Sequence, residues 1–271
     1  MLHLELPATE AEDDEVVKTI CADPEWEGHI ESWLTAYSTY RKFGGNPWFI
    51  EPADFEMAVK KRMYALYTSK RKTLALKALR DTQLASCPMC GSLATGDLDH
   101  HLPREEFAEF SVMRANLVPA CTHCNSSSKG TTYRGDDPER FIHPYFDAWA
   151  GEPLWRVEIQ APYEAATFAA IPLTDLAADR KPIVEFHLAN VLGKQFIRSV
   201  TNLWSTYPQS LIIALKAYDN ESVYEEVETD LKRAIATLGV NAWNCAFYRG
   251  VLANPDAIES IRNRIHDILA L

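Results

Sequence analysis

The chain has 271 residues, 47% of them hydrophobic, which predicts a folded globular protein with one large domain or two smaller ones. Its net charge of −11 argues at first sight against a nucleic-acid partner, since phosphate binding favours lysine and arginine. The start carries no basic region before an apolar run, and no later apolar stretch approaches the roughly 20 residues of a membrane span. We therefore expect a cytoplasmic protein with no membrane partner.

The charge is unevenly distributed along the chain. Residues 5–31 hold ten acids and one base, whereas residues 40–81 hold ten bases and four acids. The ordinary interpretation is a solvated helix face beside a mobile acidic tail. The alternative hypothesis is that the basic segment meets phosphates while the acidic arm competes for it, so that deleting residues 1–31 would strengthen DNA binding.

Helical and extended segments alternate along the chain. Apolar spacing predicts about three helices over residues 15–85, with start signals at Asp54 and Thr73. Residues 86–130 predict a hairpin, whose second strand is the short run NLVPA, followed by a helix. The runs LWRVEIQ and ATFAAIPL alternate as strands do, and from about residue 181 the pattern is helical again. We expect an α+β fold, divided into a helical region (1–85), a central part (86–145) and a mainly helical region (146–271).

Four of the six cysteines form two close pairs, Cys87-x2-Cys90 and Cys121-x2-Cys124. In a cytosolic protein such pairs favour metal over disulfides, and a two-residue gap lets one turn direct two thiolates at a tetrahedral zinc ion. Four ligands leave no open position, so this zinc is expected to be structural. His123, inside the second pair, could replace a cysteine, although a surface histidine is the favoured interpretation. The isolated cysteines, Cys21 and Cys245, are assigned no role.

The stretch DLDHHLPREEF places an acid beside two histidines, an arrangement typical of a metal site or a proton-transfer site. The order CPMCG, DHHLPR, NLVPAC, CxxCN and then Lys129 resembles the HNH endonucleases, which use a ββα-metal (His-Me) finger. This resemblance covers residues 87 to about 130 and implies a mostly helical chain wrapped around a zinc-stapled finger. A looser similarity links two later segments to the HNH proteins that are encoded beside ATPases in Septu-type antiphage systems. These segments are FIHPYFD and NAWNCAFYRGVLANPDAIESI.

The resemblance implies a role for each matching residue. His100 falls where the family has the general base that takes a proton from the attacking water. Asp99 and Asn125 fall at the positions that hold a catalytic Mg²⁺ or Mn²⁺. Asn116 falls where an asparagine tethers the connecting loop and thereby orients the histidine. The implied activity is DNA hydrolysis that leaves a 5′ phosphate and a 3′ hydroxyl, although RNA cleavage stays open.

More than one role is open for several other polar residues. Arg104 and Lys129 are predicted phosphate contacts, or else exposed charges. His101 is expected to be a packed, hydrogen-bonded side chain rather than a ligand, and His143 to cap nearby backbone. A second hypothesis for the whole chain is a zinc-stapled module that binds nucleic acid or protein and cuts nothing. Because the chain is acidic, we expect DNA binding to be helped by the 40–81 segment or by a partner such as an ATPase, and a homodimer is an equal alternative.

Overall fold

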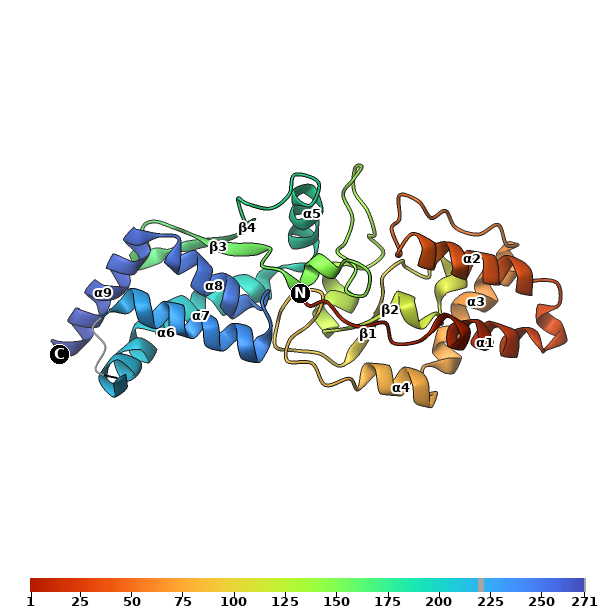
Figure 1. Cartoon of the computed structure of the whole chain (residues 1–271), viewed down its shortest axis with the longest axis horizontal. Helices are drawn as coiled ribbons and strands as arrows, with labels where there is room; N and C mark the ends of the chain where they lie inside the picture. Colours follow the sequence, from red (N-terminus) through yellow and green to blue (C-terminus); the bar gives the residue numbers. More distant parts are fainter. Residues whose placement is uncertain (219–221, 271) are drawn as a thin grey trace.

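The structure, a computed structural model, describes residues 1–218 and 222–270. The molecule is elongated, and its helices gather at two ends (Figure 1). The N-terminal helices lie at one end, the C-terminal helices at the other, and the hairpin of β1 (Asp97–His100) and β2 (Leu117–Ala120) lies between them. Among the described residues no helix combines the length and the apolar character that a bilayer crossing requires.

Four helices build the N-terminal end: α1 (Glu10–Cys21), α2 (Ile30–Lys42), α3 (Met57–Lys70) and α4 (Leu74–Arg80). Thr73 is the N-cap residue of α4, as predicted. The start expected at Asp54 is wrong, because α3 begins three residues later. The chain there is held in another way, since the Ala53 N–H donates to the Glu109 carboxylate and Phe55 is buried in the core.

The acidic segment is folded and is not a mobile tail. Its helix α1 buries Val17 and Ile20 against the other N-terminal helices. Asp13 is also buried, and its Oδ1 accepts a hydrogen bond from the Arg114 Nε at 2.8 Å. Asp14 pairs with Arg41 at 2.7 Å. The acids therefore neutralise individual arginines, and deleting residues 1–31 would open the core rather than release a competitor.

The central hairpin is antiparallel, with Asp97 opposite Ala120 and His100 opposite Leu117. The register is regular, and β1 ends at His100, so the chain can turn immediately after that residue. After β2 the chain enters a short helical segment that begins at Thr122 and is widened into a π-helix over Cys124–Ser128. The predicted order of hairpin and helix is therefore present.

The described residues of the C-terminal end form one hairpin and five α-helices. The strands of the hairpin are β3 (Trp155–Gln160) and β4 (Thr167–Pro172). The helices are α5 (Lys181–Val191), α6 (Lys194–Tyr218), α7 (Val223–Leu238), α8 (Trp243–Leu252) and α9 (Pro255–Leu269). Both strands match the predicted runs, and buried residues alternate along β3 as period-two patterning requires. The run predicted as one helical stretch from residue 181 is broken between α5 and α6, at Leu192 and Gly193. Leu271, the last residue of the predicted terminal helix, lies outside the described residues.

Two hydrophobic cores hold the hairpin from opposite sides. The loop between β1 and β2 places Leu102, Phe107 and Phe110 in the core of the N-terminal helices. On the other side, Val191 of α5 and Trp243 of α8 pack against the cysteine turns. The N-terminal core thus contains side chains from both sides of the boundary predicted at residue 85, and the hairpin depends on both groups of helices for its surroundings.

Candidate functional site

Four buried cysteines meet beside the hairpin, Cys87 and Cys90 from the turn before β1 and Cys121 and Cys124 from the turn after β2. Their sulfur atoms all lie within 4.8 Å of one another. A tetrahedral zinc ion with Zn–S bonds of about 2.3 Å holds its sulfurs about 3.8 Å apart, and the Sγ atoms of Cys90 and Cys121 are separated by 3.8 Å. The backbone N–H groups of Cys121 and Cys124 each approach a sulfur at 3.4 Å, which favours thiolates. The cluster therefore fits a structural metal such as zinc.

The C-terminal helices hold the first cysteine turn in place. Trp243 Nε1 donates to the Cys90 carbonyl oxygen at 2.7 Å, and His187 Nε2 lies 2.6 Å from the Met89 carbonyl oxygen. Because a carbonyl oxygen only accepts, His187 carries its hydrogen on Nε2. Gly91 completes the turn with φ = +81°, a conformation that glycine adopts without strain. The cysteine cluster thus joins the hairpin to the far end of the chain.

His100 presents one ring nitrogen with an available lone pair. Its Nε2 lies 3.0 Å from the Ser111 carbonyl oxygen, so Nε2 carries the hydrogen and Nδ1 keeps the lone pair. Within the described residues no hydrogen bond engages Nδ1. Tyr67 packs edge-on against the ring, with the ring centroids 4.6 Å apart. Burial lowers the pKa of His100 to about 3, so the imidazole is neutral at pH 7 and its Nδ1 lone pair can accept a hydrogen bond.

Asp99 is buried beside a buried lysine. Its Oδ2 lies 3.3 Å from the Lys129 ammonium nitrogen, and the same nitrogen donates to the His100 carbonyl oxygen at 2.6 Å. Burial raises the pKa of Asp99 to about 6, even though the charge of Lys129 acts in the opposite direction. The Lys129 side chain is 0% exposed. The prediction that Lys129 contacts phosphate is therefore wrong, because its ammonium group faces the interior and cannot reach a ligand in solvent.

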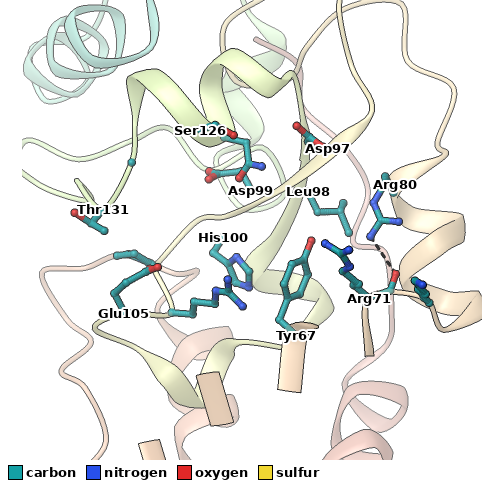
Figure 2. A pocket seen from close by; sticks show the side chains of 15 residues that line it. Tyr67, Arg71, Arg80, Asp97, Leu98, Asp99, His100, Glu105, Ser126 and Thr131 are labelled. Atoms are coloured by element: carbon teal, nitrogen blue, oxygen red, sulfur yellow. Dashed lines mark hydrogen bonds between the residues drawn. The ribbon is translucent and has the colours of Figure 1, made fainter. Parts of the chain in front are cut away.

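A cavity of about 570 Å³ opens where β1 ends (Figure 2). Asp99, His100 and Asn125 all line it, so the structure brings together the predicted base and both predicted metal ligands. Figure 2 places Asp99 and Ser126 above the His100 ring. The remaining lining residues come from four parts of the chain: Tyr67, Arg71, Lys72 and Arg80 from α3, α4 and the turn between them, Asp97 and Leu98 from β1, Ser126 from the π-helix, and Pro103, Arg104, Glu105, Gly130 and Thr131 from the loops.

Arg104 also lines this cavity, held by two tyrosines of α3. Its guanidinium carbon lies 4.0 Å from the Tyr64 ring centroid and 5.1 Å from that of Tyr67, within the range of cation–π attraction. One of its nitrogens donates to the Tyr64 carbonyl oxygen at 3.2 Å. The side chain is half-buried, and no carboxylate pairs with it among the described residues, so its charge is available to an anion in the cavity.

Asn116 ties the two ends of the loop that follows His100. Its Oδ1 accepts from the Leu102 N–H at 2.8 Å and from the Tyr40 hydroxyl at 2.9 Å. Its Nδ2 donates to the carbonyl oxygens of Leu102 and Phe110 at 3.0 and 3.3 Å. The residue is fully buried and does not reach the cavity. It is therefore a tether, and it holds the loop that supplies the Ser111 carbonyl to His100.

The other singled-out histidines lie outside this cavity. His101 stacks on His143 with ring centroids 3.9 Å apart, and its buried Nδ1 has no hydrogen bond. His143 accepts from the Tyr145 N–H at Nδ1 and contacts the Tyr40 hydroxyl through Nε2. His123 Nε2 lies 2.6 Å from the Ser128 hydroxyl and is not part of the cysteine cluster. His101 is thus packed as predicted but incompletely hydrogen-bonded, and His143 contacts backbone as predicted.

Sequence reasoning missed Tyr67, which packs on His100 from a helix about thirty residues earlier in the chain. No local pattern marks it, because a tyrosine on an amphipathic helix is usually a core residue. The sequence marks Arg71, Lys72 and Arg80 only as members of the basic segment 40–81. The fold brings them to the cavity.

Comparison with known proteins gives one distant relative. Protein ea31 of Escherichia phage lambda is 28% identical over 159 residues, which cover 55% of this chain and 53% of the phage protein. The chain thus spans about half the length of this curated relative. No protein-family model matches the chain, and no solved structure matches it.

Proposed function

We propose that this protein is a metal-dependent endonuclease of the HNH type that hydrolyses phosphodiester bonds in DNA. One observation carries the proposal: the Ser111 carbonyl fixes the His100 hydrogen on Nε2 and leaves the lone pair on Nδ1, in a cavity that Asp99 and Asn125 also line. A module that only binds its partner would gain nothing from a neutral proton acceptor beside two oxygen ligands.

The side chains at the cavity suit a divalent ion. Asp99 Oδ2 is buried without a hydrogen bond, and Lys129 approaches it only as an ion pair. Asn125 adds an amide oxygen to the same cavity. Oxygen ligands of this kind favour Mg²⁺ or Mn²⁺. Bound by Asp99 and Asn125, such an ion supplies positive charge for the leaving 3′ oxygen.

His100 provides the proton transfer. Its Nδ1 accepts a proton from the water that attacks phosphorus, and its Nε2–H bond to the Ser111 carbonyl keeps the ring in one orientation. Asn116 acts through the loop that carries Ser111 and is a positioning residue. Because the bond between phosphorus and the 3′ oxygen breaks, cleavage leaves a 5′ phosphate and a 3′ hydroxyl.

A partner protein is part of the proposal. A chain with a net charge of −11 binds DNA weakly unless its cations are concentrated or a second protein assists. The loose Septu-like similarity favours an ATPase partner and a role in antiphage defence, and a homodimer would serve the same purpose. Efficient cleavage of DNA by the purified protein alone at physiological salt would contradict the need for a partner.

Plasmid cleavage with Mg²⁺ or Mn²⁺ tests the activity, comparing the intact protein with His100→Ala after both are shown to retain zinc. We expect nicked or linear product from the intact protein and none from the variant. His123→Ala is the matched control, since its ring lies outside the cavity and should leave cleavage intact. If His100→Ala cuts as fast as the intact protein, the assigned base is wrong. If neither cuts, even with a neighbouring ATPase added, the zinc-stapled binding module becomes the better description.

A further inference from the structure

Three cations border the cavity on the side contributed by the N-terminal helices. Arg71 and Lys72 lie in the turn between α3 and α4, and Arg80 is the last residue of α4. In Figure 2, Tyr67 stands between the His100 ring and the guanidinium groups of Arg71 and Arg80. This cationic wall, defined as Arg71, Lys72 and Arg80, therefore shares a cavity with His100 without touching it.

The wall shares its cavity with the carboxyl groups of Asp97, Asp99 and Glu105 but forms no ion pair with them. Among the described residues no carboxylate pairs with any of its three cations, whereas Arg41, Arg62 and Arg114 each pair with an acid of the N-terminal segment. The Arg80 Nη2 donates to the Arg71 carbonyl oxygen at 3.0 Å, which fixes one guanidinium group in place. Neighbouring like charges repel, and in a chain of net charge −11 nearby acids could easily have balanced them. An anion is the partner that such a wall lacks.

The cavity is large enough to take more than the reacting group. Its volume is about 570 Å³. One phosphate group and one attacking water fill only part of that space. In Figure 2, Asp99 and His100 lie to the left of Arg71 and Arg80, with Tyr67 between the His100 ring and the two arginines, so an extended chain of phosphates fits better than a single phosphate.

We infer that Arg71, Lys72 and Arg80 bind the backbone phosphate next to the one that is cleaved. This inference rests on the proposed function, which assigns the cleaved phosphate to His100 and Asp99. The wall comes from the turn after α3 and from the end of α4, outside the hairpin and the cysteine turns. It would make the protein select a nucleic-acid polymer over a nucleoside monophosphate, because the monophosphate has no second phosphate for the wall.

Equilibrium binding of a short fluorescent DNA duplex tests the inference without any cleavage, in a His100→Ala background verified to contain zinc. Adding Arg71→Ala together with Arg80→Ala should weaken binding about tenfold at physiological salt, and should reduce the slope of log affinity against log salt by about 2. The matched control removes the same charge elsewhere, with Arg198→Ala and Lys232→Ala on the exposed surfaces of α6 and α7. It should change neither quantity.

Equal weakening by the two double variants would mean that only net charge matters, and would overturn the subsite. Unchanged binding in the Arg71 and Arg80 variant would overturn it as well. Hydrolysis of bis(4-nitrophenyl) phosphate by the intact protein with Mn²⁺ tests the nuclease separately, since this compound has one phosphate. Absence of that hydrolysis and of plasmid cleavage, both with a neighbouring ATPase added, alongside a specific loss of DNA binding would reject the nuclease and retain the phosphate subsite.

Discussion

The ammonium nitrogen of Lys129 lies 3.3 Å from the Asp99 carboxylate, and both side chains are almost completely buried. The same ammonium donates to the backbone carbonyl of His100. One side chain after the second cysteine pair therefore holds the last two residues of β1. Buried charges that pair in this way stabilise the fold mainly by compensating each other, because either one alone would be buried without a partner.

Replacing Lys129 should therefore destabilise the protein strongly. Lys129→Met leaves the Asp99 carboxylate buried and unpaired, and we expect the free energy of unfolding in urea to fall by about 3–5 kcal/mol. If Asp99 holds a divalent ion, Mn²⁺ should restore part of this loss in the variant. Lys232→Met, on an exposed surface, should change the free energy little. A Lys129→Met protein as stable as the wild type would show that the ion pair does not contribute to the free energy of unfolding.

The cysteine cluster should bind one zinc ion per chain. Cys90→Ser removes one of four ligands, so we expect zinc measured by elemental analysis to fall well below one equivalent and the melting temperature to drop. Cys245→Ser is the matched control, because Cys245 is buried but lies outside the cluster. Full zinc content in Cys90→Ser would rule out the four-cysteine site.

Asn116 should matter for stability as much as for activity. Asn116→Ala leaves the Leu102 N–H and two carbonyl oxygens without their buried partner, and we expect a loss of about 3 kcal/mol or more in urea unfolding. Tyr40→Phe removes the hydroxyl that donates to Asn116 and also contacts His143 Nε2, so a smaller loss of about 1–3 kcal/mol is expected. If the two variants were equally stable, Asn116 would not be the main tether of the loop.

Acid should destabilise the protein through its buried histidines. Burial lowers the pKa of His143 to about 3, so the folded state keeps this ring neutral while the unfolded chain takes up a proton below about pH 6.5. The stability that His143 contributes is thus complete above pH 6.5 and is lost as the pH falls toward 3. At pH 5 the loss from this group is about 2 kcal/mol.

Urea unfolding of the wild type and of His143→Gln at pH 7 and pH 5 isolates this contribution. Glutamine supplies a donor toward Tyr40 and an acceptor toward the Tyr145 N–H but does not ionise, so the variant should lose less stability on acidification. Any weakening of the zinc site at low pH affects both proteins and cancels in the difference. An identical pH dependence in the two proteins would contradict the assignment.

Several features could be predicted from the sequence because they depend on residues that are close along the chain. A two-residue gap brings Cys87 and Cys90 together in one turn, and Cys121 and Cys124 in another, whatever the rest of the fold does. Alternation of apolar residues likewise indicates the strands that became β3 and β4. The position of His100 at the end of β1 follows from the proline that soon ends the run.

Only the tertiary structure decided which way the polar side chains face. Lys129 was expected in solvent, and it is buried because the packing of the cysteine turn against β1 directs it toward Asp99. The acidic segment was expected to be mobile, and it is folded because Asp13 finds Arg114 about a hundred residues later. Tyr67 reaches the cavity from α3, and the cationic wall reaches it from the following turn and the end of α4. Local spacing determines which residues share an element, whereas contacts between distant segments determine what those residues meet, and the second kind of information is absent from any single stretch of sequence.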